Sequence, residues 1–459
     1  MSSSGSLRES LQSLLARGDA GECVALAMRE KPDEATVLWL LDQARGWHAQ
    51  GLHDLQREVC ELVLARVPDH FEALHLLGYD AQAQGDYARA EALYARAAKA
   101  RPDFAFARLA CAQMRMMQTS FAEGRDEYEA RFEAVTEGSG GDWRGLPIAR
   151  WRGEPLAGKK VYIWAEQGLG DVAMFAGFLP RLLQMNPARV ALGMFPKLMT
   201  LFARSFPAID VEPLDDVINH ALGPSVLDAL PMIEKLAGQG AVPFSIAPLQ
   251  AASRYAQRHG LFDFALPMGD LMVHMMPDAA PARQGPYLAA DPARVEAVKA
   301  RLQKLGAGTR VGISWHTTNV RETTRNAPLE AWLPLLMTPG MHFISLQHHA
   351  DSQDIARFCA AHGCHITVDT KTDPLADAEG LAALIASMDH VVTIDNANAH
   401  LAGALGVPTL LLLARGCNYR WPLLLQDKTL WYAGVSTLRQ SELGDWPPVM
   451  QEAARRLAT

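Results

Sequence analysis

The chain has 459 residues, too many for one hydrophobic core and enough for about three domains. Hydrophobic residues make up 49% of it and charged residues 20%, a composition typical of globular proteins that excludes a disordered chain. The formal net charge of −8 argues against a general nucleic-acid binder, although one local basic pocket for a phosphate group is compatible with it.

The sequence predicts a cytoplasmic protein without a transmembrane segment. Its first ten residues, MSSSGSLRES, lack the basic and apolar segments of a secretory signal. The longest apolar runs, such as residues 407–414, are far shorter than the ~20 residues that cross a bilayer. The cysteines form no CxxC pair and are typical of reduced, mostly buried thiols: Cys23, Cys60, Cys111, Cys359, Cys364 and Cys417.

A repeat is the first feature along the chain. Residues 69–104 carry small, bulky and turn-forming residues at positions that resemble a tetratricopeptide repeat: Leu77, Gly78, Gly85, Ala90, Tyr94, Ala97 and Pro102. A step of ~34 residues back leads to Gly51 and Pro68, and a step forward leads to a degenerate copy through Ala112 and Tyr128. We expect about three stacked helical hairpins, with an irregular helical array as the alternative.

The composition changes after Phe132. Residues 137–141, Glu-Gly-Ser-Gly-Gly, predict a flexible hinge. Beyond it, short apolar runs alternate with amphipathic helical patterns. We expect a strand over 160–165, a helix over 171–184 and a further strand over 189–195.

The same alternation is clearer in the last third of the chain. We expect strands over 310–315, 342–347, 365–369, 390–395 and 409–413, and helices over 352–361, 375–388 and 397–405. Strands that alternate with helices form a mostly parallel sheet covered on both faces. Two such blocks, about 159–276 and 310–457, predict two Rossmann-like domains that face each other across a cleft. The chain is therefore divided into a helical domain, residues 1–136, and two α/β domains, residues 142–290 and 291–459.

A glycine-rich loop opens the first α/β block. Gly168 and Gly170 follow Glu166 and Gln167 after a strand and precede a helix, in a G-x-G-x-x-A arrangement that invites dinucleotide binding. Such binding needs an acidic residue about 20 positions on, at the end of the next strand, to hold the ribose. The strand over 189–195 has none, so the pattern argues against an NAD-type site and leaves a loop at the mouth of the cleft.

Asp171 follows these glycines at the start of the predicted helix. It can cap the helix by accepting backbone N–H bonds. It can also act as a general base that takes a proton from an acceptor hydroxyl. Spacing alone leaves both interpretations open, and one residue can do both.

A second motif surrounds Asp395, where a strand ends and a helix begins within two residues. Free backbone N–H groups and the positive end of the helix dipole point into the cleft there, which suits a phosphate. His400, one turn into the helix, can donate a further bond to a phosphate or hydroxyl. The alternative is a helix cap and a satisfied polar residue.

Four segments in this order resemble bacterial glycosyltransferases with tetratricopeptide repeats: WRGEPLAGKKVYIWAEQGLGD, VGISWHTTNVRETTRNAPLEAWLPLL, FISLQ and DHVVTIDNANAHLAGALGVPTLLLL. The catalytic part of that group is similar to the ADP-heptose:lipopolysaccharide heptosyltransferases, which have the GT-B fold. The resemblance begins at about Asp69. It implies an α plus α/β protein: a tetratricopeptide-repeat helical array, then a GT-B fold of two Rossmann-like domains. The first of these would serve the acceptor and the second the nucleotide-sugar.

The resemblance also implies roles for residues. Asp171 matches the candidate base, Arg325 matches a basic residue facing the donor phosphates, and Gln347 lies at a strand end near the nucleotide. The donor-binding turn is formed by Asp395, Asn396, Ala397, Asn398 and His400. The family usually has a small hydroxyl residue where this chain has Asn396, whose amide can still donate to a phosphate oxygen.

These residue types fit glycosyl transfer. A carboxylate deprotonates the incoming hydroxyl, while helix N-termini and Arg325 receive the charge of the departing nucleotide without a metal. No cofactor or metal is expected besides the nucleotide-sugar substrate. The histidines near Cys359 and Cys364 have no accepted zinc-ligand spacing.

The resemblance further implies that the repeats capture a protein acceptor, with flagellin as one candidate, modified on Ser or Thr. One alternative is transfer to lipopolysaccharide or another glycan. Another is an adaptor whose repeats bind partners and whose transferase half is degenerate.

Overall fold

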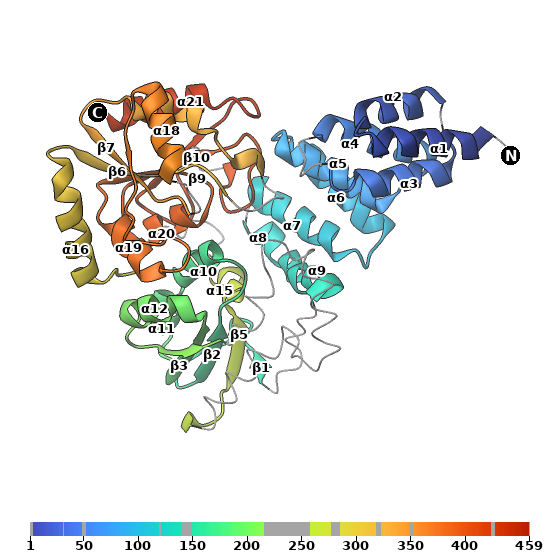
Figure 1. The fold of residues 1–459 in the computed structure, drawn as a ribbon. Coiled ribbons are helices and arrows are strands. Elements are labelled where there is room, and N and C mark those ends of the chain that lie inside the picture. Colours follow the sequence, from blue (N-terminus) through green and yellow to red (C-terminus); the bar gives the residue numbers. More distant parts are fainter. Residues whose placement is uncertain are drawn as a thin grey trace. The chain divides into compact units, whose positions relative to one another are not determined.

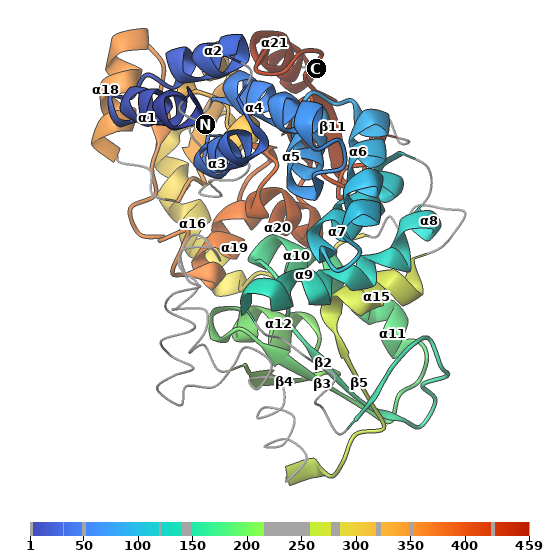
Figure 2. The same cartoon turned by 90° about the vertical axis from the view of Figure 1, so that its right-hand side faces the viewer.

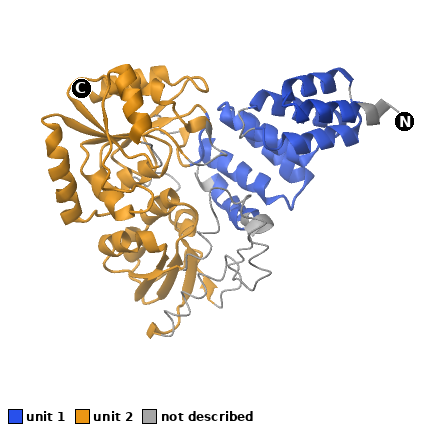
Figure 3. Ribbon diagram, in the orientation of Figure 1, with its two compact units in different colours: residues 1–134, 319–323, 416–419 blue, residues 135–318, 324–415, 420–459 orange. Residues whose placement is uncertain are grey.

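A computed structural model describes residues 3–30, 32–47, 52–118, 121–139, 148–214, 258–276, 285–317, 323–348, 352–423 and 427–458. The chain forms two compact units (Figure 3). Unit 1 consists of Met1–Ala134, Asn319–Thr323 and Gly416–Tyr419, and unit 2 of Val135–Thr318, Thr324–Arg415 and Arg420–Thr459.

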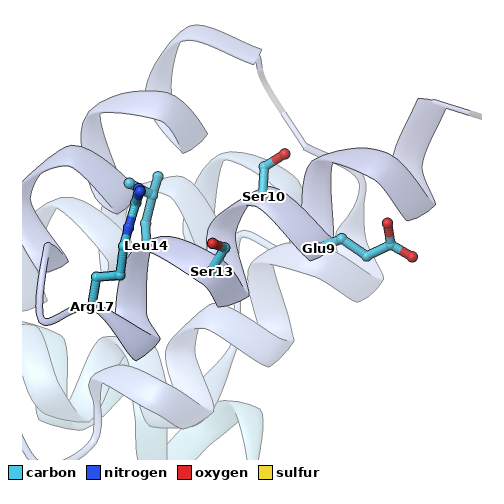
Figure 4. A pocket seen from close by; sticks show the side chains of 5 residues that line it. All are labelled: Glu9, Ser10, Ser13, Leu14 and Arg17. Carbon is cyan, nitrogen blue, oxygen red and sulfur yellow. The ribbon is translucent and has the colours of Figure 1, made fainter.

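Unit 1 is a helical array. Its helices are α1 (Ser3–Ala16), α2 (Ala20–Glu30), α3 (Glu34–Ala44), α4 (His53–Arg66), α5 (Phe71–Ala83), α6 (Tyr87–Ala100), α7 (Ala105–Gln118) and α8 (Phe121–Arg125), followed by α9 (Ala130–Ser139), which runs past its boundary. Helix α4 packs on α3 and α5, and α6 packs on α5 and α7 (Figures 1 and 2). A hollow on α1 is lined by Glu9, Ser10, Ser13, Leu14 and Arg17, none of them a predicted site residue (Figure 4).

The predicted small and bulky partners of the repeat meet between α5 and α6. A Cβ atom on Gly78 would lie 2.6 Å from Cε1 of Tyr94, so only glycine allows this approach. Gly85 has a φ of 75°, the left-handed conformation that favours glycine, and turns the chain between the two helices. The helical-repeat prediction is confirmed here, while Gly51 lies outside the described residues.

Unit 1 also includes residues 416–419, from far along the sequence. The backbone N–H of Cys417 donates to the Tyr87 hydroxyl at 3.0 Å. The hydroxyl oxygens of Tyr128 and Tyr419 lie 2.9 Å apart, and both rings are buried. Four residues of the second half of the chain are thus held by side chains of the helical array, which sequence patterns did not predict.

The predicted hinge differs from the structure in its first part. Helix α9 continues to Ser139, so residues 137–139 are helical, and residues 140–141 lie outside the described residues. Glycine and serine are tolerated in this stretch because it forms the last turn of the helix, where the backbone carbonyl groups have no intrahelical hydrogen-bond partners.

The first sheet of unit 2 is five-stranded and parallel. Its strand order is β1 (Ala149–Arg150), β5 (Phe264–Pro267), β2 (Lys160–Trp164), β3 (Arg189–Met194) and β4 (Asp210–Pro213). The associated helices are α10 (Leu169–Ala176), α11 (Leu179–Leu183), α12 (Met199–Ser205) and α15 (Met268–Met275). Arg150 of β1 and Asp270 of α15 form a buried ion pair with two hydrogen bonds of 2.6 and 2.7 Å, which fastens the edge strand to the helix.

The single helix predicted over residues 171–184 is wrong. The structure has two helices, α10 and α11, separated at Gly177 and Phe178. Pro180 lies in the first turn of α11 and has no N–H to continue the hydrogen-bond ladder of α10.

The second sheet of unit 2 is six-stranded and also parallel. Its order is β11 (Val435–Arg439), β10 (Thr409–Leu413), β9 (His390–Ile394), β6 (Thr309–Ser314), β7 (Met341–Ser345) and β8 (Ile366–Thr367). Its helices are α16 (Pro292–Leu302), α17 (Leu333–Leu336), α18 (Ser352–His362), α19 (Ala378–Ala386), α20 (Ala397–Leu405) and α21 (Pro447–Leu457).

The strands and helices predicted in this block are confirmed, with shorter bounds for β8 and α19. Helix α19 begins late because Asp377 caps it, accepting the Gly380 N–H at 2.9 Å. A helical array followed by two parallel α/β sheets confirms the predicted fold class. Among the described residues, no helix is long and apolar enough to span a bilayer.

Candidate active site

Helices α10 and α20 pack against each other (Figures 1 and 2). A Cβ atom on Gly170, in the first turn of α10, would lie 2.9 Å from Cδ2 of His400 and 3.4 Å from Cα of Ala397. Glycine therefore permits this approach, which brings the two motifs predicted from sequence together. The positive dipole ends of both helices therefore lie close together, which favours an anion.

The loop before α10 is held by its own side chains. Glu166 accepts the backbone N–H of Gly269 at 2.8 Å, at the start of α15. Gln167 has a φ of 66°, which is uncommon for a residue with a side chain and marks a constrained turn. Asp171 Oδ2 accepts the Gly168 N–H at 3.3 Å, so Asp171 does bond to the backbone at the helix start. Its action as a base stays a prediction.

Asp171 also forms an ion pair that the sequence did not predict. Its Oδ1 lies 2.5 Å from Nη2 and 2.7 Å from Nε of Arg420, and the two side chains are only 13% and 19% exposed. Arg420 follows β10, whose carboxyl end lies at the same edge of the sheet as the end of β9. That shared edge was a usable signal, because ligand-binding residues of parallel sheets gather at the carboxyl ends of strands.

A second acid and arginine pair forms at the end of β9. Arg325 Nη1 donates to Asp395 Oδ2 at 2.9 Å and to the Asp395 carbonyl at 3.0 Å. Burial raises the pKa of Asp395, but the guanidinium groups of Arg325 and Arg420 outweigh it and hold that pKa below its usual range. Asp395 is therefore ionised, and Arg325, expected to face the donor phosphates, bonds to it in this structure.

His400 is buried and neutral. Its Nδ1 lies 2.8 Å from the Tyr432 hydroxyl, and its ring stacks on Trp421 with centroids 4.8 Å apart. Burial lowers the pKa of His400 to about 4. The predicted contact of His400 with a phosphate would therefore be a neutral hydrogen bond, and the arginines supply the positive charge.

The two asparagines of the turn form hydrogen bonds within it and to neighbouring segments. Asn396 caps α20 by accepting the Asn398 N–H at 3.0 Å, and its Nδ2 donates to the Ser314 hydroxyl at 2.7 Å. Asn398 Nδ2 donates to the Leu346 carbonyl at 3.1 Å. The Asn396 amide, which we expected to donate to phosphate in place of a hydroxyl, thus bonds to the neighbouring strand β6.

Gln347 has a comparable internal role. Its Oε1 accepts the backbone N–H groups of Trp315 and His316 at 3.1 and 2.9 Å, and its Nε2 donates to the carbonyls of His316 and His348 at 3.1 and 3.0 Å. It ties the end of β7 to the loop after β6. Its predicted place near the nucleotide stays a prediction.

The site contains two carboxylates and two guanidinium groups, whose charges cancel, beside the N-termini of two helices. Such a set can accept a proton at one carboxylate and neutralise an anionic leaving group at the arginines and helix ends. Among the described residues, no three of the His, Cys, Asp and Glu side chains come together in a way that would hold a metal ion.

No protein-family model matches the chain. Protein FlbA of Caulobacter vibrioides is 30% identical to it over 460 residues, which span 97% of this chain and 71% of FlbA.

Structural neighbours are glycosyltransferases. A glycosyl transferase family 9 protein of Veillonella parvula is 12% identical, with a TM-score of 0.43 over 63% of this chain and 88% of its own. The heptosyltransferase WaaC of E. coli, solved with ADP-2-deoxy-2-fluoro heptose, is 15% identical, with a TM-score of 0.40 over 65% and 100%. An O-GlcNAc transferase of Thermobaculum terrenum is 15% identical, with a TM-score of 0.30 over 92% of both chains.

Proposed function

We propose that this chain, which belongs to the family of protein FlbA of Caulobacter vibrioides, is an inverting glycosyltransferase that moves a sugar from a nucleotide-sugar to a hydroxyl of a protein. The observation that carries the proposal is the meeting of Asp171 with the turn from Asp395 to His400 where α10 and α20 begin. Both motifs lie in segments that resemble bacterial glycosyltransferases with tetratricopeptide repeats.

The reaction needs one base and a receiver for negative charge. The acceptor oxygen bonds to the anomeric carbon as the bond from that carbon to the donor phosphate breaks, and the attack from the opposite face inverts the configuration. Asp171 takes the proton of the acceptor hydroxyl. The nucleoside diphosphate leaves with the bonding electron pair, and Arg325 and the helix N-termini neutralise it.

Unit 1 is proposed to capture the acceptor. Stacked helical repeats offer an extended surface suited to a peptide or a helix, which a small sugar does not need. From the resemblance to repeat-bearing bacterial glycosyltransferases, flagellin is the first acceptor to test, with Ser or Thr as the modified residue.

Donor binding is tested first with a panel of nucleotide-sugars and thermal unfolding. A true donor at about 100 times its Kd stabilises the protein by about 2.7 kcal/mol. ADP-, UDP-, GDP- and CDP-sugars are compared, and a panel in which none raises the unfolding temperature overturns the proposal.

Asp171 is tested with Asp171→Asn, whose amide cannot take the acceptor proton. Donor binding should not be lost, while transfer falls by at least ~100-fold. The control is Asp377→Asn. Asp377 also caps a helix and pairs with an arginine, accepting the Gly380 N–H and two 2.9 Å contacts from Arg294. Equal, small losses of transfer activity in both variants would mean that Asp171 is only a structural helix cap.

The acceptor class is tested by offering a labelled donor to flagellin and, separately, to a lipopolysaccharide acceptor. Label on flagellin Ser or Thr supports the protein acceptor. Label on the glycan alone replaces it with the glycan alternative. Donor binding with transfer to neither would redirect the search to other proteins bound by unit 1.

A further inference from the structure

In this structure both carboxylate oxygens of Asp171 are occupied. Oδ1 lies against two nitrogens of Arg420, and Oδ2 accepts the Gly168 N–H. A carboxylate held in this way is poorly placed to take a proton from an acceptor hydroxyl, because its lone pairs already accept hydrogen bonds. If Asp171 is the base, Arg420 must leave it before transfer.

The backbone around Arg420 is fixed, while its side chain is long. Trp431 Nε1 donates to the Arg420 carbonyl at 2.6 Å, and Arg439 Nη2 donates to the Trp421 carbonyl at 3.0 Å. Trp421 in turn stacks on His400. The Arg420 guanidinium can therefore change partners by rotation of its side chain without movement of the loop that carries it.

An anion entering this site would compete for that guanidinium. The charges of Asp171, Arg420, Asp395 and Arg325 balance in the structure, and the charge of Arg420 reaches Asp395 and His400 as well as Asp171. A diphosphate brings at least two negative charges. Guanidinium binds phosphate oxygens in pairs, and the converging helix ends place a diphosphate within the reach of such a side chain.

We propose that Arg420 is a further donor-binding residue that exchanges Asp171 for the diphosphate of the donor, so that donor binding frees the base. The proposal rests on the proposed function and deepens it, since it makes the order of binding a consequence of the site: donor first, acceptor second. Asp171 competes with the donor for one cation.

The competition is tested by calorimetry of ADP binding to the full-length protein, with UDP and GDP in parallel. Arg420→Gln should weaken binding by at least ~10-fold, about the loss of one charged hydrogen bond. Asp171→Asn should tighten binding by a few-fold, because Arg420 is then free for the phosphates. In a protein that already carries Arg420→Gln, Asp171→Asn should not change ADP affinity further. If Asp171 contributed only to folding, this dependence on Arg420 would not be expected.

Arg294→Gln is the control, since it breaks the surface pair with Asp377 and should not change ADP affinity. Arg420→Gln leaves Asp171 without its partner, so folding is checked by circular dichroism. Should that variant not fold, the double variant with Asp171→Asn, which removes both charges, is compared with Asp171→Asn alone and should bind ADP at least ~10-fold more weakly.

Several outcomes overturn the exchange. Unchanged or weaker ADP binding by Asp171→Asn shows that Asp171 and the diphosphate do not compete. Unchanged binding by Arg420→Gln, or by the double variant relative to Asp171→Asn, removes Arg420 from the donor site. In these cases the parent still binds a nucleotide and the proposed function stands. Failure of the parent to bind any nucleoside diphosphate or nucleotide-sugar overturns the proposed function itself.

Discussion

Mild acid should destabilise unit 2 through His400. Burial lowers the pKa of His400 from 6.5 to about 4, so the unfolded chain binds a proton in a pH range where the folded chain does not. The neutral imidazole favours folding fully above pH 6.5, and this contribution is lost as the pH falls from 6.5 to about 4. Between pH 7 and pH 5 the loss amounts to about 2 kcal/mol of unfolding free energy.

The perturbation is His400→Asn, whose amide can keep a hydrogen bond to the Tyr432 hydroxyl. The variant loses the stack on Trp421 and is less stable at every pH, so the informative quantity is the change with pH. Urea unfolding at pH 7 and pH 5, followed by tryptophan fluorescence, should show a drop about 2 kcal/mol smaller in the variant than in the parent.

His75 provides the matched control. It lies in α5 of unit 1, and burial lowers its pKa to about 4 as well. His75→Asn should flatten the pH dependence of the helical unit and leave that of unit 2 unchanged. Equal losses in the parent and in His400→Asn would refute the reasoning, because they would mean that His400 in the folded protein titrates near its ordinary pKa.

Three substitutions test the packing that supports the site. Arg150→Met removes the arginine of the ion pair with the fully buried Asp270 carboxylate and should lower the free energy of unfolding in urea by about 3–5 kcal/mol. Adding Asp270→Leu should restore much of that stability, and a loss below about 1 kcal/mol for the single variant would contradict a buried pair. Gly170→Ala places a methyl group 2.9 Å from the ring of His400. It should lower the free energy of unfolding by about 1–3 kcal/mol and weaken ADP binding in calorimetry. Gly416→Ala would place a methyl group against the carbonyl of Gln82 in α5 and should lower the melting temperature seen by circular dichroism, whereas Gly21→Ala, in open space, should not.

Deletion of the helical domain is a poor way to separate acceptor capture from sugar transfer. Tyr87 and Tyr128 hold residues 416–419, and Arg420 is the next residue along the chain. A fragment that begins after residue 136 would expose the buried Tyr419 ring beside the arginine that binds Asp171. Point variants in the full chain avoid that difficulty.

Much of the local structure followed from the sequence alone. Helix α20 and strand β10 have the predicted bounds, because each is an apolar segment with clear ends. Asn396 caps the start of α20 through its side chain, and Gly406 ends it with a φ of 79°. The contact between Gly78 and Tyr94 was also predictable from the sequence, because both residues occupy defined positions of a helical repeat.

The partners of the catalytic candidates were decided by the tertiary structure. Asp171 and Arg420 are 249 positions apart, and Arg325 and Asp395 are 70 apart. The same holds for Cys417 and Tyr87, which are 330 positions apart. Backbone periodicity and capping act over a few residues, so they show in the sequence as patterns. Which charge meets which depends on how two sheets and their helices pack. The place of Arg420 after β10 indicates the edge of the sheet near which it lies, but not that Asp171 is its partner.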